Sequence, residues 1–193
     1  MIVKTIKTVV MVFIVMVFIG IAYPLFVTLI AQLVMPYQAN GSLLYVDGKV
    51  VGSELIGQSF TSPGYFHGRP SAVDYDATNS SGSNLGPSSA KLMEQVKQRV
   101  EQVRRENGLA PDAPVPADMV LASGSGLDPN ISPENARLQI GHVAKARSLP
   151  ESDIKALVEK FIEPPQFGML GAEKINVLKL NIALDELAKK NKK

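Results

Sequence analysis

The sequence predicts an α+β protein with one N-terminal transmembrane helix, followed by a single extracytoplasmic domain that has a small sheet and about four helices. Three observations lead to this fold class. The run Thr8–Val34 is apolar and uncharged, an Asp-Gly pair follows between two apolar stretches, and later segments repeat apolar residues with helical spacing. The expected order of elements is a β-hairpin, a long loop, a helix, a strand, two helices and then a strand or helix, which predicts an α+β domain with a small sheet.

The run Thr8–Val34 is long enough to cross a bilayer, because about 20 helical residues span the ~30 Å hydrocarbon core. A cleaved signal peptide is the alternative, since Lys4 and Lys7 precede the run and small residues occur at Gly20-Ile21-Ala22. A signal peptide has an apolar region of about 7–15 residues, whereas this one continues to Val34. We therefore expect a membrane anchor over residues 1–36 (helix about 8–34) and a separate domain over 37–193.

Charge predicts the orientation of this helix. Lys4 and Lys7 lie before it, whereas no charged residue occurs after it until Asp47. The positive-inside rule then places the N-terminus in the cytoplasm and residues 37–193 on the outer side.

Several residues interrupt the apolar character of the helix: Gly20, Tyr23, Pro24, Thr28 and Gln32. Pro24 has no N–H for the carbonyl of Gly20, which predicts a kink. The interruptions indicate either a face that packs on partner helices in the membrane or an ordinary anchor that tolerates polar residues.

Composition excludes several functions. Lys4 and Lys7 supply two of the 20 basic residues, so the rest of the chain carries equal numbers of basic and acidic residues. No basic field for nucleic acid is expected. The chain has no cysteine and two histidines, which predicts no disulfide, no cysteine nucleophile and no metal site.

After the anchor, Leu43–Val51 predicts a β-hairpin around Asp47-Gly48, and Ser53–Phe60 a third short strand or a turn. Residues 61–89 form a long loop rich in Gly, Ser, Asn and Pro, and loops of this length are usually functional or disordered. Its aromatic anchors favour an ordered, partner-facing loop with these candidate contacts: Tyr65, Phe66, His67, Arg69 and Asn84.

The second half predicts mainly helices. Apolar spacing and capping residues predict helices over 89–107, 132–147, 150–162 and 177–188, with Ser132 as an N-cap and Pro133 at the first helical position. Residues 118–122 are expected to form a buried strand, 123–131 a turn, and 175–177 the end of a strand.

The glycine- and serine-rich stretch Ser123–Gly126 lies before a predicted helix, as an anion site would, but it fits neither a Walker A loop nor a nucleophile elbow. A tight turn is the favoured interpretation, with nucleotide binding as the alternative. His67, Arg69, Asp74 and Asp76 favour polar pairing within the loop over acid–base chemistry. No catalytic residue is expected; the alternatives for the whole chain are a membrane-anchored periplasmic hydrolase or binding protein, and an anchored adhesin-like domain.

Four motifs in order resemble the C subunit of the bacterial Kdp potassium-transporting ATPase. They are Tyr65-Phe66-His67-Gly68-Arg69-Pro70-Ser71, Gly82-Ser83-Asn84-Leu85-Gly86-Pro87-Ser88, Val115 to Pro133 with Ala122-Ser123-Gly124-Ser125-Gly126-Leu127-Asp128-Pro129, and Asn176 to Asp185. The chain departs at Asn130, where histidine is expected, and at Ala172-Glu173-Lys174, which lacks an expected proline.

The resemblance implies a non-catalytic subunit in a bacterial inner membrane, with potassium as the transported ion and no covalently bound cofactor. Its implied partners are a channel-like A subunit, a P-type ATPase B subunit, a small single-span F subunit and membrane lipid. It also implies a role in raising the ATP affinity of the pump subunit, with nucleotide contacts at Ser123, Gly124, Ser125, Gly126 and Gln139. An outward-facing domain would hold these residues away from cytoplasmic ATP, which favours assembly and shaping of the outer ion entrance.

Overall fold

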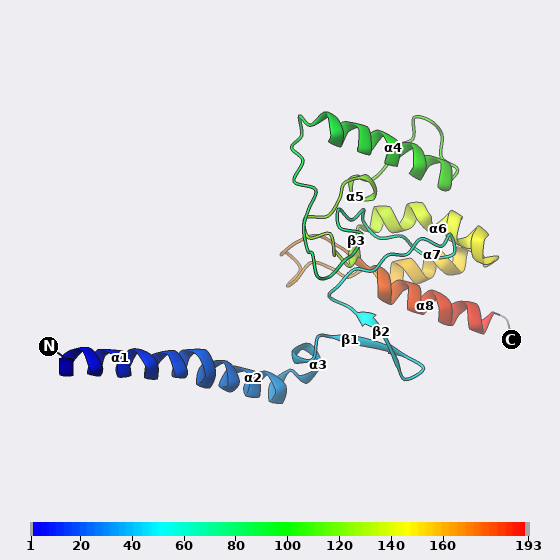
Figure 1. Ribbon diagram of the computed structural model, residues 1–193. Coiled ribbons are helices and arrows are strands. Elements are labelled where there is room, and N and C mark those ends of the chain that lie inside the picture. The colour runs from blue at the N-terminus through cyan, green and yellow to red at the C-terminus, as the bar shows by residue number, and fades with distance from the viewer. Residues whose placement is uncertain (1, 192–193) are drawn as a thin grey trace. The chain divides into compact units, whose positions relative to one another are not determined.

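The computed structural model describes residues 2–191, and the described chain divides into two compact units, one ending at Leu43 and one beginning at Leu44 (Figure 1). Together the helices and two small antiparallel sheets confirm the predicted α+β class. The elements in chain order are α1 (Ile2–Val17), η1 (Phe18–Ala22), α2 (Tyr23–Val34), α3 (Pro36–Ala39), β1 (Leu43–Val46), β2 (Lys49–Ser53), α4 (Ala90–Glu106), α5 (Ala117–Val120), β3 (Asn130–Ile131), α6 (Pro133–Arg147), α7 (Glu151–Lys160), β4 (Ile175–Asn176) and α8 (Val177–Lys190).

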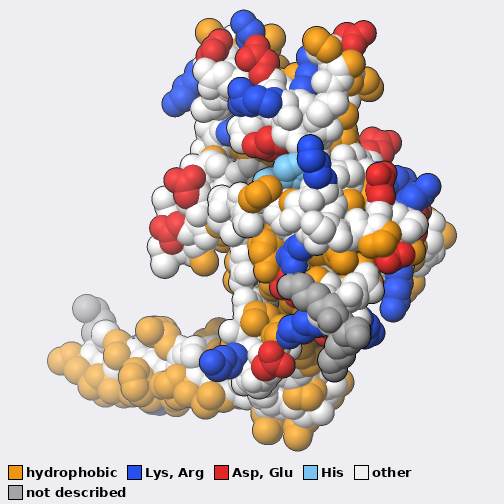
Figure 2. Space-filling model, turned by 90° about the vertical axis from the view of Figure 1, so that its right-hand side faces the viewer, with side chains coloured by type: hydrophobic (Ala, Val, Ile, Leu, Met, Phe, Trp, Pro, Cys, Tyr) orange, Lys and Arg blue, Asp and Glu red, His pale blue; other side chains and the backbone are white. Residues whose placement is uncertain are grey.

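In the first unit α1, η1 and α2 join into one helix, Ile2–Val34, which is apolar and long enough to cross a membrane. Nearly all its side chains are exposed, and Figure 2 shows that many of them are apolar. The N–H of Tyr23 donates to the carbonyl of Phe18, five residues back, and the π-helical turn Phe18–Ala22 ends two residues before Pro24. The helix thus has a wider turn where the missing proline N–H predicted a kink.

The end of this helix is fastened to the short helix α3. The amides of Gln32 and Asn40 bond to each other at 3.3 and 3.2 Å, and Asn40 Nδ2 also donates to the carbonyl of Pro36 at 2.6 Å. Gln32, expected on the partner-facing helix, is therefore bonded within its own unit.

The second unit opens with the predicted hairpin. Asp47 and Gly48 have φ values of 50° and 76°, which is the conformation that a type I′ turn requires at both central residues. After β2, the segment that follows Ser53 is a turn and not a third strand.

The predicted strand over residues 118–122 is wrong. Residues Ala117–Val120 form the short helix α5, with Pro116 as its N-cap, and Leu121 is exposed. A short apolar run is compatible with either element, so periodicity could not decide between them. The strand lies instead at β3, within the expected turn, and pairs antiparallel with β4: Asn130 faces Asn176 and Ile131 faces Ile175.

The core lies where α6, α7 and α8 pack together, under the β3–β4 ladder. It is apolar and completely closed to solvent at its centre, with these buried members: Phe66, Ile131, Ala136, Ile140, Val143, Ala144, Ile154, Val158, Ile175, Val177, Leu180 and Leu184. Helix α4 lies outside this core and packs on α5 (Figure 1). Arg99 and Arg104 of α4 donate to the carbonyls of Val120 and Ala113.

Candidate functional site

Two side-chain amides clamp the long loop between α6 and α8. The N–H and C=O of Phe66 bond to the amide of Asn181 at 2.9 and 3.0 Å, and those of His67 bond to the amide of Gln139 at 2.8 and 3.1 Å. Successive residues of an extended chain direct their backbone groups to opposite sides. Asn181 on α8 and Gln139 on α6 therefore supply, from opposite sides, the backbone hydrogen bonds that neighbouring strands would supply in a sheet.

The side chain of Phe66 is 0% exposed and belongs to the core of the second unit. This corrects the expectation that Phe66 faces a partner, because its ring is entirely inside the fold. Its role is to anchor the loop, while the clamp satisfies its buried backbone groups.

Tyr65 is held by the same two helices. Its hydroxyl donates to Asp185 at 3.1 Å, and Asp185 forms an ion pair with Arg147 at 2.6 Å. The Arg147 guanidinium lies 4.4 Å from the centroid of the Tyr65 ring, a cation–π contact. Three of the five candidate loop residues, Tyr65, Phe66 and His67, are thus fixed to α6 and α8.

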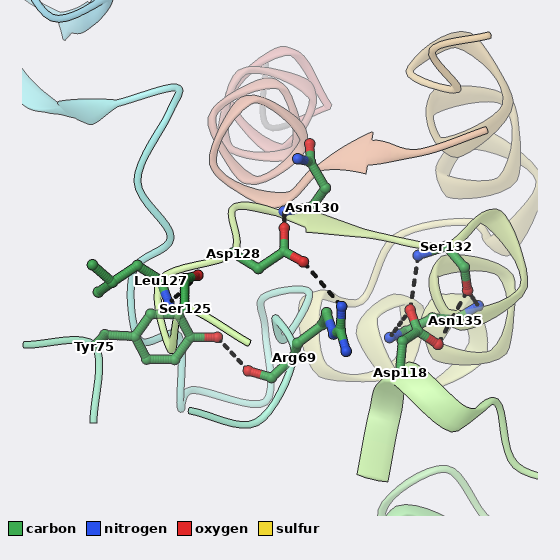
Figure 3. A network of polar contacts seen from close by, with 9 residues as sticks. All are labelled: Arg69, Tyr75, Asp118, Ser125, Leu127, Asp128, Asn130, Ser132 and Asn135. Carbon is green, nitrogen blue, oxygen red and sulfur yellow. Dashed lines mark hydrogen bonds and ion pairs between the residues drawn. The ribbon is translucent and has the colours of Figure 1, made fainter. Parts of the chain in front are cut away.

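A second polar network joins the long loop to the glycine- and serine-rich stretch (Figure 3). Arg69 pairs with Asp128 at 3.1 Å, and Asp128 also accepts from the N–H of Asn130 at 3.0 Å. The hydroxyl of Ser71 donates to the carbonyl of Gly126 at 2.8 Å. Asn84, the remaining candidate of the loop, is exposed with a φ of 52°.

Asp118, which sequence analysis placed in a strand, occupies the N-terminus of α6 (Figure 3). Its carboxylate accepts from Ser132 N at 2.8 Å and from Asn135 Nδ2 at 3.0 Å, and the Ser132 hydroxyl caps the helix by accepting from Asn135 N at 3.1 Å. The predicted N-cap at Ser132 is confirmed. A helix N-terminus attracts anions, and here a carboxylate of the same chain already occupies that position.

The residues Ser123–Gly126 have divided roles. Ser123 is buried and its N–H donates to the carbonyl of Pro70 at 3.0 Å, whereas Gly124 and Ser125 are exposed. Gly126 has a φ of 69°, and a Cβ there would lie 2.5 Å from Val73 Cγ2, so only glycine fits. This part of the loop is a packed turn with an exposed tip.

Gln139 lies elsewhere, in a cleft of about 210 Å³ between α4, α6 and the loop, which none of the described residues 123–126 lines. The cleft also holds the two histidines, whose ring centroids are 6.4 Å apart. His142 Nδ1 lies 2.7 Å from the carbonyl of Glu106. These histidines are far apart along the chain, so no local sequence pattern pairs them. Among the described residues, no group of three potential metal ligands occurs.

The Tyr75 hydroxyl donates to the carbonyl of Arg69, and this bond predicts a pH dependence. Burial, followed by the nearby Asp128 carboxylate, raises the pKa of Tyr75 above its usual value of 10.0, while Arg69 opposes this. The folded chain therefore keeps the phenol proton at a pH where the unfolded chain has lost it. Stability from this group is complete below about pH 10 and falls as the pH rises further.

Urea unfolding of the wild type and Tyr75→Phe at pH 8 and pH 10.5 measures this effect. At pH 8 the variant should lose only the hydrogen bond, about 1 kcal/mol. Between the two pH values the wild type should lose more stability than Tyr75→Phe. Equal losses would show that the phenol titrates alike in both states.

The fold and the site define a class of protein with one apolar helix and a small α+β domain. The buried polar side chains of that domain fix the conformation of its long loop by hydrogen bonds. The chain matches the family described as KdpC, the K⁺-transporting ATPase c chain, over residues 5–186. A potassium-transporting ATPase KdpC subunit of Caldanaerobacter subterraneus subsp. tengcongensis is 52% identical over 178 residues, 92% of each chain. One of Nitratidesulfovibrio vulgaris is 54% identical over 172 residues, 86% of each, and one of Methylobacterium nodulans 52% over 185 residues, 89% of this chain and 90% of the relative.

The chain belongs to the KdpC family. This membership confirms the resemblance found in the four sequence motifs. It also confirms an accessory subunit of a potassium-transporting ATPase, which is not an enzyme by itself.

Proposed function

We propose that this subunit supports the assembly of a channel-like A subunit with a P-type ATPase B subunit and a small F subunit, and covers the outer ion entrance. Residues 1–36 anchor it in the inner membrane and residues 37–193 form its periplasmic domain. The observation that carries the proposal is the combination, in a KdpC chain, of one apolar helix with a long loop held in one shape by α6 and α8. A loop that is already ordered pays little further entropy when it binds a partner.

The orientation rests on charge. Lys4 and Lys7 lie at the start of the apolar helix, and its other end runs into the uncharged helix α3. Positive residues remain in the cytoplasm, so the second unit is exported. The face that includes Gly20, Tyr23, Pro24 and Thr28 then packs on the membrane helices of the partners, and the π-helical turn at Phe18–Ala22 lies within it.

Direct binding of ATP at Ser123–Gly126 and Gln139 stays a prediction from the family resemblance. Two observations favour a structural role for these residues instead. Gln139 uses its amide to hold His67 and Asn135, and the carboxylate of Asp118 occupies the α6 N-terminus beyond the stretch. A phosphate at that N-terminus would meet a negative charge.

A topology experiment tests the proposal. Alkaline phosphatase, which is active only outside the cytoplasm, and a cytoplasm-dependent fluorescent protein are each fused after residue 193. We expect phosphatase activity with the full chain and none when the helix is preceded by a second membrane span that reverses the orientation. A fluorescent cytoplasmic fusion would overturn the proposed orientation.

Purification tests the role in assembly. A tag on this chain should recover much larger membrane subunits together with potassium-stimulated ATPase activity, and the tagged chain alone should have none. An active chain that purifies without partners would favour the alternative, an anchored periplasmic hydrolase or binding protein.

A further inference from the structure

Between α7 and α8 the chain forms an exposed hairpin over residues 163–174, which leaves the globule as the faint orange trace in Figure 1. Phe167, Met169 and Leu170 at its tip are 87%, 79% and 57% exposed. We call these three residues the apolar tip. Three exposed large apolar side chains within four residues of one projection differ from apolar residues scattered singly over a surface, which need no explanation.

The hairpin is rigid enough to present the apolar tip in one conformation. Glu163 and Lys174 exchange both backbone bonds at 2.8 and 3.1 Å, and Gln166 and Leu170 do the same at 2.9 Å each. At the base, Lys179 pairs with Glu163 at 3.6 Å and with Glu54 at 2.7 Å. Residues Ile175–Asn176 continue directly into the β3–β4 ladder of the core. The tip is therefore ordered before it meets a partner, which lowers the entropy cost of binding.

Phe167 has a backbone conformation that its side chain disfavours. Its φ is 54°, in the left-handed region, where a bulky residue is a genuine outlier. Gly168 follows with a φ of 75°, and its N–H donates to the carbonyl of Pro165 at 2.9 Å. A strained and largely exposed phenylalanine contributes little to folding, so its position at the tip is better explained by binding.

The chemistry of the hairpin distinguishes a protein partner from a lipid surface. Between Lys160 and Lys174 the only charged residues are Glu163 and Glu173, and no Trp or Tyr occurs there. Segments that bind the membrane interface carry Lys or Arg for anionic lipids and often Trp or Tyr. Glu163 is already paired with Lys174 and Lys179 at the base of the hairpin, and residues 161–173 contain no basic residue. A tip of Phe, Met and Leu without basic residues instead fits an apolar pocket, as at the centre of protein interfaces.

We infer that the apolar tip of Phe167, Met169 and Leu170 inserts into an apolar pocket on the extracytoplasmic surface of a larger subunit of the same transporter. This inference rests on the proposed function, because it requires the second unit to lie outside the cytoplasm beside that subunit. The tip is the contact through which assembly is made.

The test uses the full complex, purified through a tag on the largest subunit, with wild type and variants of this chain titrated into complex that lacks it. Phe167→Asn is the most informative variant, because asparagine tolerates the left-handed conformation and should leave the fold intact. Met169→Ser is compared with Met93→Ser on α4, a methionine that is 65% exposed. We expect Phe167→Asn and Met169→Ser each to weaken incorporation about tenfold or more, and Met93→Ser to have no effect.

A photo-crosslinking residue at position 169 identifies the contact in the assembled complex. Crosslinks to a transporter subunit would support the inference, whereas crosslinks to lipid alone would overturn it. If wild type fails to bind the complex, the proposed function fails. If wild type binds and the tip variants bind equally well, only the inference about the tip fails.

Discussion

Replacing Phe66 with alanine is expected to destabilise the second unit by about 3–5 kcal/mol, the usual cost of removing a buried aromatic side chain. The ring is 0% exposed and packs in the core with Ile131 and Leu180. Its loss leaves a cavity at the point where the long loop enters the core. Since domains are stable by only about 5–15 kcal/mol, a large share of that stability would be lost.

Urea unfolding of the detergent-solubilised full chain, followed by circular dichroism, measures this loss. Phe167→Ala provides the control, because the same atoms are removed from a side chain that is 87% exposed, and the change should stay within about 0.5 kcal/mol. Equal stability of Phe66→Ala and Phe167→Ala would show that the loop is not anchored in the core.

Gln139→Leu and Asn181→Leu should each destabilise the second unit by about 2–4 kcal/mol. Each change leaves a backbone N–H and C=O of the loop buried without partners, at about 1–3 kcal/mol for each group. The two amides bond to adjacent residues, His67 and Phe66. Loss of the bonds to one of these residues therefore weakens the bonds to the other. The double variant should therefore lose less stability than the sum of the single losses, by about 0.5–3 kcal/mol.

These two variants also separate a structural role of Gln139 from a nucleotide contact. Both amides are buried and make the same pair of bonds to the loop, but only Gln139 is a candidate for binding ATP. If Gln139 is structural, Gln139→Leu and Asn181→Leu should change the ATP affinity of the assembled complex equally. A loss of ATP affinity in Gln139→Leu alone, with the complex intact, would assign Gln139 to the nucleotide.

The sequence was most informative where a local pattern has one structural solution. The Asp47-Gly48 turn has the backbone that its hairpin requires, and Ser132 caps α6 as expected. It misled at residues 118–122, because a short apolar run fits a strand or a helix and the contacts of Asp118 with Ser132 and Asn135 decide between them. Those partners lie far enough along the chain that no periodicity connects them.

The candidate site was only partly predictable for the same reason. The loop motif around Phe66 was recognised, but the ring is buried and its backbone is held by Asn181, which lies on another element. A buried amide gives no periodic signal, because its partner is a backbone group that every residue possesses. The apolar tip had no signal either, since exposure depends on how the whole chain packs.

By itself, the sequence determined that an apolar helix precedes a neutral α+β domain of the KdpC family, because hydropathy, charge and motifs are properties of consecutive residues. The tertiary structure alone decided which polar residues hold the loop and which apolar residues remain outside. Those outcomes depend on contacts between segments distant along the chain, such as Gln139 with His67, and such contacts exist only once the long loop has packed against α6.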